Sequence, residues 1–185
     1  MQEESHIDVD DKTFPLVSVV MLTYNHRPYI RQALDSVLEQ KAPFSFEVLV
    51  GDDASTDGTS EIVREYAARY PKQVIGLVRP HNLGATRNLG DLFSRCRGSY
   101  IAGCEGDDYW LDAHKLEKQV HFLECHPEYI ACSHEVQIVD RQGIPLLDQR
   151  LDWICRGREY TFSCIGGIRL PGHPVALVFR NIFLA

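Results

Sequence analysis

The sequence has no apolar run long enough to cross a membrane, no C-x-x-C pair and no excess of positive charge. A bilayer-spanning helix needs about 20 consecutive apolar residues. The opening stretch MQEESHIDVDDK is acidic and polar, unlike a secretory signal. Because 19 Lys and Arg stand against 26 Asp and Glu, the formal net charge is −7, whereas nucleic-acid binding needs clustered positive charge. These absences predict a cytoplasmic protein that does not bind nucleic acid.

The six cysteines are scattered along the chain. Several lie inside apolar stretches, where a reduced thiol behaves as a small hydrophobic side chain. Cys125 and Cys132 lie among three histidines, but their spacing matches no zinc-binding motif. We therefore expect neither a disulfide framework nor a zinc site.

Both common glycine-rich phosphate-binding patterns are absent as well. Neither G-x-G-x-x-G nor G-x-x-x-x-G-K-[ST] follows the first apolar run, which argues against a dinucleotide-dependent dehydrogenase and against a P-loop nucleotide hydrolase. What the chain does have is 185 residues with 44% hydrophobic content. That is enough to build the core of one domain.

From Pro15 onward, short apolar runs alternate with amphipathic segments, a pattern typical of strands and crossover helices in an α/β sheet. The predicted strands cover residues 17–22, 46–50, 74–78, 99–104 and 175–179. The predicted helices cover residues 30–38, 62–70, 87–95 and a segment that ends before Pro127. Residues 129–139 are expected to be extended and residues 141–143 to form a turn. The predicted fold class is therefore α/β, with a mostly parallel, Rossmann-like central sheet flanked by helices.

Acidic residues follow several of the predicted strands. In an open α/β sheet, ligands bind beyond the carboxyl ends of the strands. Carboxylates gathered there raise one another's pKa, and a hard divalent cation relieves the repulsion. The sequence therefore predicts a metal site at this edge, and the five acids concerned are Asp52, Asp53, Glu105, Asp107 and Asp108.

Two of the neighbouring acids have a second explanation, because Asp in a strand-to-helix loop commonly caps the helix. Asp52 is open to either role, and for Asp57, immediately before Gly58, we favour the cap. Tyr24 can stack on a base or sugar, or simply cover the core. Arg87 can neutralise a diphosphate, or lie on a solvated helix face.

Five segments in series resemble the motifs of family 2 glycosyltransferases. They are Val17 to Asn25, the helix up to Gln40, Glu47 to Thr59, Asn82 to Gly84 with Arg87 and Asn88, and Gly98 to Asp108. The resemblance covers roughly residues 15–140, in the family's order and at natural spacing. It implies a glycosyltransferase A fold with a half that binds a nucleotide sugar.

The resemblance also implies roles for individual residues. Thr23 and Tyr24 would line the nucleoside pocket, and Asp53 would hydrogen-bond the base, typically uracil. Asp107 would lie near the ribose or donor sugar, Arg87 near the nucleotide, and Asp108 would ligate magnesium or manganese bridging the diphosphate. The implied reaction is direct inverting displacement by a hydroxyl of a saccharide or lipid-linked acceptor, in cell-surface polysaccharide synthesis. A lipid-linked acceptor would bring the protein to the inner face of the membrane.

Such a displacement needs a general base, which in the family is an acid after the metal motif, commonly in a Glu-Asp pair. The acids after Val136 are unpaired, and they are Asp140, Asp148, Asp152 and Glu159. His173 is the remaining candidate, against its reading as a loop histidine. The chain ends shortly after the strand predicted at 175–179, so we expect a C-terminally truncated protein in which the base-bearing segment is missing.

The expected organisation is an acidic flexible tail at residues 1–14 and one domain at residues 15–185. Residues 15–140 would form the nucleotide-sugar-binding half and residues 141–185 part of the acceptor half. Two alternatives stay open: a nucleotidyltransferase, which usually carries a glycine-rich basic loop that is missing here, and a nucleotide-sugar-binding module without turnover. Nothing in the sequence indicates an oligomeric state.

Overall fold

The computed structural model describes residues 14–146 and 173–184. The expected N-terminal tail at residues 1–14 therefore lies almost entirely outside the described residues, and so do the acids Asp148, Asp152 and Glu159. The strands are β1 (Val17–Thr23), β2 (Phe46–Asp52), β3 (Val74–Val78), β4 (Tyr100–Gly103), β5 (Ala131–Cys132) and β6 (Val178–Arg180). The helices are α1 (Ile30–Leu38), α2 (Thr59–Arg69), α3 (Ala85–Arg95) and α4 (Lys115–Cys125), with a short 3-10 turn at Pro174–Ala176.

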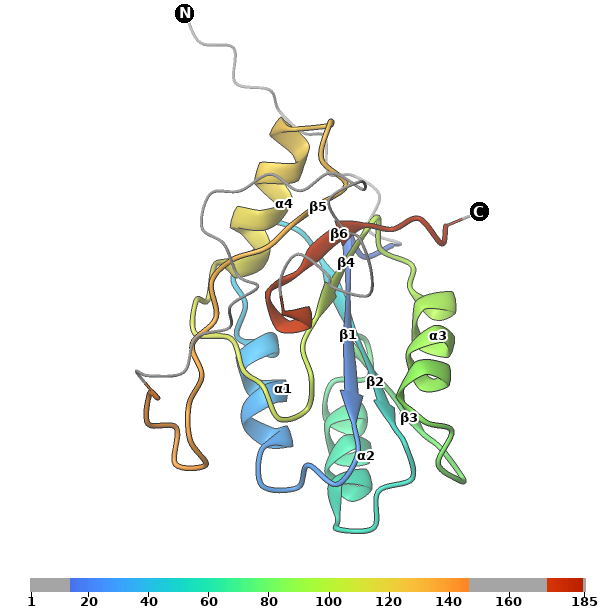
Figure 1. Ribbon diagram of the computed structural model, residues 1–185. Helices are drawn as coiled ribbons and strands as arrows, with labels where there is room; N and C mark the ends of the chain where they lie inside the picture. Colours follow the sequence, from blue (N-terminus) through green and yellow to red (C-terminus); the bar gives the residue numbers. More distant parts are fainter. Residues whose placement is uncertain (1–13, 147–172, 185) are drawn as a thin grey trace, which may run out of the picture.

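The described strands form one mixed sheet in the order β3-β2-β1-β4-β6-β5 (Figure 1). β1 pairs in parallel with β2 and β4, and β2 pairs in parallel with β3. β6 is antiparallel to both of its neighbours. The prediction of a mostly parallel α/β sheet is confirmed. Because β1 pairs in parallel with β2 and β4, the carboxyl ends of these three strands lie at the same edge of the sheet.

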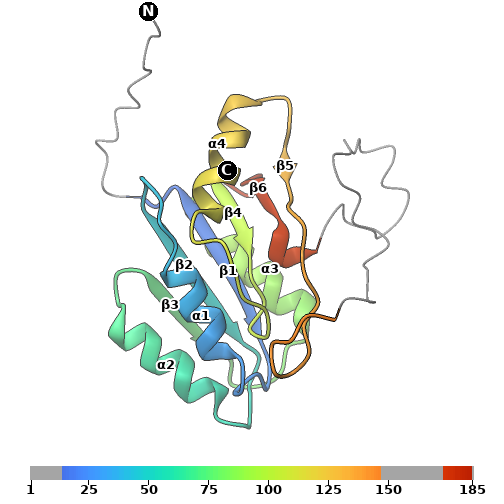
Figure 2. The ribbon, with the colours of Figure 1, turned by 90° about the vertical axis from the view of Figure 1, so that its left-hand side faces the viewer.

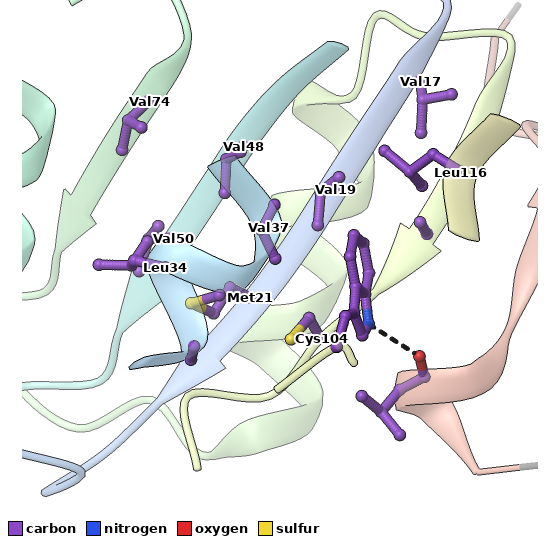
Figure 3. Close-up of a cluster of buried hydrophobic side chains, with 14 of the residues drawn as sticks. Val17, Val19, Met21, Leu34, Val37, Val48, Val50, Val74, Cys104 and Leu116 are labelled. Atoms are coloured by element: carbon purple, nitrogen blue, oxygen red, sulfur yellow. Dashed lines mark hydrogen bonds between the residues drawn. The ribbon is translucent and has the colours of Figure 1, made fainter. Parts of the chain in front are cut away.

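Helices cover both faces of the sheet (Figures 1 and 2). The apolar faces of α1, α2 and α4 pack on one side in a single buried cluster, whereas α3 packs on the other side in a second cluster around Leu92. In Figure 3, Leu34 and Val37 of α1 lie against side chains of the parallel strands, which are Val19, Met21, Val48 and Val50. The near-continuous apolar runs of β1 and β2 are explained by this burial on both faces.

A buried carboxylate joins β1, β2 and the segment that leads into β4. Glu47 is 2% exposed and accepts a 2.7 Å hydrogen bond from the Ser18 hydroxyl. Arg97 donates to Glu47 through its Nε at 2.9 Å and through its backbone N–H at 3.0 Å. Because the buried charge is paired and its oxygens are hydrogen-bonded, it can be tolerated inside the sheet.

The predictions near the end of the chain need correction. The strand predicted at 175–179 begins later, because Pro174 opens a 3-10 turn and only Val178–Arg180 joins the sheet. Within the segment predicted to be extended at 129–139, only Ala131–Cys132 pairs with another strand. The turn predicted at 141–143 is confirmed, with Gly143 at φ +79° and its N–H donating to Asp140 O at 3.0 Å.

Candidate functional site

The segment after β4 runs closely alongside the end of β1. The backbone N–H of Gly106 donates to Leu22 O at 2.8 Å, and a Cβ on Gly106 would lie only 2.6 Å from Thr23 Oγ1. Thr23 is 2% exposed, and its hydroxyl has no hydrogen-bond partner. A glycine at position 106 therefore lets the acidic loop of residues 105–108 lie directly on the end of β1.

His26 also lies against this loop. Its Nδ1 is 3.6 Å from an Asp107 carboxylate oxygen and is buried without a hydrogen bond. The sequence reasoning did not include His26 among the site residues. Its position in the polar loop directly after β1 is a signal that could have identified it, because ligands bind at such strand ends.

Three side chains near the end of β4 have the composition of a metal site. Asp108 Oδ2 is buried without a hydrogen bond and lies 3.7 Å from Nδ1 of His173. Ligand atoms of Glu105, Asp108 and His173 all lie within 4.8 Å of one another. A separation of 3.7 Å is too long for a hydrogen bond, but it suits two ligands that are each about 2.1 Å from one cation. These residues therefore fit a divalent cation.

The same surroundings change the acidity of Asp108. Burial is the main cause that raises the pKa of Asp108, to about 6, and His173 counteracts part of the rise, while Asp107 and Glu105 add to it. A carboxylate that is desolvated and surrounded by like charge is stabilised in its ionised form by a cation. The raised pKa of Asp108 and the distances among the three side chains therefore both fit a bound divalent cation.

Asp52, one of the five acids predicted at this edge, is instead hydrogen-bonded to two neighbouring serines. Buried Asp52 accepts hydrogen bonds from the hydroxyls of Ser55 and Ser60. The prediction that five carboxylates share one metal site is therefore wrong for Asp52. Asp57 accepts a 2.9 Å bond from the backbone N–H of Thr59, the first residue of α2, and so it caps that helix as we favoured.

Asp53 connects the end of β2 to the start of α3. It is 5% exposed, and its two oxygens accept bonds from the backbone N–H groups of Leu83 at 2.7 Å and Gly84 at 2.9 Å. The contact holds the first turn of α3, which carries the exposed Arg87, beside the strand end. Tyr24 is 47% exposed at the end of β1. The structure thus brings Thr23, Asp107, Asp108 and His173 together, and it places Asp53 in the loop after β2 and Arg87 on the first turn of α3.

A cavity of about 870 Å³ lies beside the acidic loop. Its lining includes Asp107, Asp108 and His173, together with residues of α1, α4 and the segment 134–141. Thr23, Tyr24, Asp53 and Arg87 do not line it. The residues expected to bind the nucleoside therefore lie outside the cavity, whereas the acidic loop contributes to its lining.

A parallel sheet with a polar loop after β1 and a candidate metal site after β4 defines a class of ligand-binding α/β proteins, those of the glycosyltransferase A fold. The sequence model described as Glycosyl transferase family 2 matches residues 18–184. The chain belongs to this family, as the resemblance implied. This membership decides against the nucleotidyltransferase alternative.

Individual relatives agree with the family. An uncharacterized protein of Mycobacterium tuberculosis is 47% identical over 127 residues, which are 69% of this chain and 37% of that protein. The mannosyltransferase PcManGT of Pyrobaculum calidifontis, in complex with GDP-Man and Mn²⁺, is 29% identical with a TM-score of 0.59 over 69% of this chain and 37% of its own. S. aureus TarS 1–349, in complex with UDP, shares the fold with a TM-score of 0.61 at 22% identity, over 89% of this chain and 46% of its own.

The chain thus spans less than half the length of these three proteins. Among the described residues, no helix is both long enough and apolar enough to cross a membrane.

Proposed function

We propose that this chain is the donor-binding part of a metal-dependent inverting glycosyltransferase that uses a nucleoside diphosphate sugar, with uridine as the expected nucleoside. The observation that carries the proposal is Asp108 Oδ2, a buried oxygen without a hydrogen bond that faces His173 beside Glu105. The likeness to PcManGT, whose complex holds a nucleotide sugar and Mn²⁺, supports both the ligand class and a divalent metal, manganese or magnesium.

Each side of the acidic loop has its own task in this proposal. Thr23 and Tyr24 at the end of β1 line the nucleoside pocket, and Asp53 hydrogen-bonds the base. Arg87 on the first turn of α3 offsets the charge of the diphosphate. Asp107 binds the ribose or donor sugar, while Asp108 holds the metal. The bound metal stabilises the diphosphate leaving group as the bond to the sugar breaks.

The position of His173 supports a role as a metal ligand better than a role as general base. An imidazole nitrogen has one lone pair. That of Nδ1 accepts a long 3.4 Å bond from the backbone N–H of Val175, and ligation of a cation beside Asp108 and Glu105 would replace this bond. A nitrogen that ligates a cation cannot at the same time accept the proton of the acceptor hydroxyl. We therefore assign His173 to the metal and not to the base.

In the proposed division of the chain, residues 15–140 contain the donor-binding half. Residues 141–185 contribute His173 to the metal site and form part of an acceptor half. The acceptor is a saccharide or a lipid-linked saccharide used in cell-surface polysaccharide synthesis, and a lipid-linked acceptor would hold the enzyme at the membrane face.

Thermal unfolding with UDP or GDP, each with and without Mn²⁺, tests the binding part of the proposal. We expect UDP to raise the Tm only when Mn²⁺ is present. Asp108→Asn should remove that metal-dependent rise and leave the fold without ligand at least as stable, because it relieves repulsion within the loop. Asp91→Asn, in an ion pair on α3, is the control that should keep the rise. Equal nucleotide binding in the Asp108→Asn variant would refute the metal assignment, and assays of sugar transfer and of UDP release then test turnover.

A further inference from the structure

Two polar atoms of α4 are buried without hydrogen-bond partners in the wall of the 870 Å³ cavity. They are Nζ of Lys115 and Oε1 of Gln119. Lys115 is 3% exposed and Gln119 is 8% exposed. Because residues four apart lie on the same side of a helix, the two side chains share one region of the cavity. Both also neighbour Cys132, whose thiol interacts electrostatically with Lys115 and lies 3.6 Å from Gln119 Nε2.

The orientation of the Gln119 amide is fixed by its neighbours. Its Nε2 donates to the carbonyl oxygens of Ala176 at 2.9 Å and Cys132 at 3.2 Å. Two carbonyl acceptors can only face the NH₂ group, so the amide cannot be reversed. Oε1 is therefore an acceptor that needs a donor from elsewhere.

Lys115 has a cationic head group with no anionic partner among the described residues. Its Nζ lies 4.2 Å from the ring centroid of Trp110, and the indole is held by a 3.0 Å bond from its Nε1 to Val175 O. A cation–π contact offsets part of the desolvation of an ammonium group, but it leaves the N–H donors without acceptors. Burial accordingly lowers the pKa of Lys115 to about 7.

Lys115 Nζ is a hydrogen-bond donor and Gln119 Oε1 is an acceptor, so a ligand that satisfies both must accept one hydrogen bond and donate another. A carboxylate or phosphate could accept from Lys115, but it has no hydrogen to donate to Gln119 Oε1. A hydroxyl group both accepts and donates, and a sugar ring carries several on adjacent carbons. An unmade hydrogen bond at a buried group is unfavourable, so a polyhydroxylated ligand would satisfy what the protein leaves open.

The location of Lys115 and Gln119 indicates whether the bound sugar would be the donor or the acceptor. The residues proposed to bind the nucleoside lie over β1 and β2, outside the cavity, whereas Asp107, Asp108 and His173 line the same cavity as Lys115 and Gln119. An acceptor must approach the reacting carbon from the side opposite the leaving group. The cavity therefore adjoins the candidate metal site without including the residues proposed to bind the nucleoside.

We propose that this cavity binds the saccharide acceptor, with Lys115 donating a hydrogen bond to an acceptor hydroxyl and Gln119 Oε1 accepting one. The inference rests on the proposed function and deepens it, because it assigns the acceptor chemistry to two residues of α4. Lys115 and Gln119 act in binding and orientation, and the displacement itself does not involve them.

Saturation-transfer NMR with methyl glycosides of glucose, galactose, mannose and N-acetylglucosamine, in the presence of UDP and Mg²⁺, tests the proposal on the full chain. We expect at least one glycoside to bind the parent protein and Lys115→Met to weaken its binding at least tenfold. Lys115→Gln keeps a donor and should restore part of the affinity. Lys72→Met, at an exposed position beyond α2, is the matched control and should bind like the parent.

Stabilisation by UDP and metal, measured on the same samples, separates the two proposals. If that stabilisation is present and no glycoside binds, or if Lys115→Met binds glycoside as well as the parent, the acceptor assignment is wrong while the donor site stands. If UDP and metal fail to stabilise the parent, the proposed function itself fails. A crystal structure in which an ordered water joins Nζ to Oε1 and stays when glycoside is soaked in would also overturn the acceptor assignment, since one water can satisfy both atoms.

Discussion

At the scale of single residues, the site is marked by buried polar atoms that have no hydrogen-bond partner. Such atoms are rare in native structures, yet Thr23 Oγ1, His26 Nδ1 and Asp108 Oδ2 lie around the short loop that contains Gly106. Polar atoms that are left unbonded at a strand end can form hydrogen bonds with a polar ligand, and the ligand then supplies the missing partners. The loop sequence alone shows the acids but not which of their oxygens stay unbonded.

Gly106→Ala tests how closely the loop must approach β1. The new Cβ would lie 2.6 Å from Thr23 Oγ1 and 2.9 Å from His26 Nδ1, so both side chains must move. We expect a loss of stability of about 1–3 kcal/mol from overpacking and weaker stabilisation by UDP with Mn²⁺. Gly90→Ala is the control, because its Cβ would meet nothing within 4 Å in α3, and it should stabilise by about 0.5–1 kcal/mol. Urea unfolding measures both, and equal effects of the two changes would refute the close approach.

Lys115 also predicts a pH dependence of stability. Its pKa falls from an ordinary 10.5 to about 7 on folding, so between these values the unfolded chain holds a proton that the folded chain has released. The free energy of unfolding then rises with pH across this window, by at most about 1.4 kcal/mol per pH unit. Below pH 7 the lysine is charged in both states, and the full penalty of burying the charge remains.

Lys115→Met removes this titration. We expect the variant to be more stable than the parent at pH 7 and below, and the difference to shrink as the pH rises towards 10. Urea unfolding of both proteins at several pH values measures the difference, in which groups that do not interact with Lys115 cancel. Lys118→Met, at an exposed position paired with Asp112, serves as control and should show no such trend. A difference that stays constant with pH would contradict the buried charge.

At the scale of elements, the parallel strands were the most predictable. The strand predicted at 74–78 coincides with β3, and those predicted at 17–22 and 46–50 each end one or two residues short of the real strand. A continuous apolar run is sufficient there, because helices cover both sides. The end of the chain was less predictable. Val175 does not join the sheet, because Pro174 begins a 3-10 turn there and because the indole N–H of Trp110 donates a hydrogen bond to the Val175 carbonyl oxygen.

The candidate site was predictable to the same extent. Thr23, Asp107 and Asp108 were identified from strand ends, and their meeting follows from the parallel pairing of β1 with β4. The role of Asp52 was not evident, because its two serine partners come from a loop and from the first turn of α2. Lys115 has no signal in the sequence at all, since only tertiary packing shows that this particular lysine on an amphipathic helix is buried.

The buried Glu47 predicts how strongly the elements depend on one ion pair. Glu47→Ala leaves the Ser18 hydroxyl and the Arg97 guanidinium without their shared acceptor between β1, β2 and the start of β4. Arg97 is half exposed and can be solvated, so the loss arises mainly from the buried Ser18 hydroxyl and the vacated space, and we expect about 1–3 kcal/mol in urea unfolding. Glu65→Ala breaks the fully exposed pair with Arg31 and should have a much smaller effect. Similar losses in the two variants would show that burial of Glu47 is unimportant.

At the scale of the whole molecule, the candidate metal site connects the parallel centre of the sheet to its short antiparallel edge strands. β1, β2 and β4 form the parallel centre, whereas β6 and β5 add three and two residues at the edge. Glu105 and Asp108 follow β4, but His173 precedes the turn that leads into β6. A cation bound by both segments would therefore restrain the edge of the sheet against its centre.

Hydrogen exchange measures that restraint directly. Without metal, we expect the amides of residues 175–180 to exchange faster than those of β1 and β2, because few strand pairings hold them. Adding Mn²⁺ and UDP should slow exchange at residues 175–180, since binding to the folded form opposes local opening, while amides at the centre of β2 change little. In Asp108→Asn, the slowing should disappear. If UDP and Mn²⁺ raise the Tm of the parent but leave residues 175–180 unprotected, the metal is held without His173, and the segment before β6 has no part in donor binding.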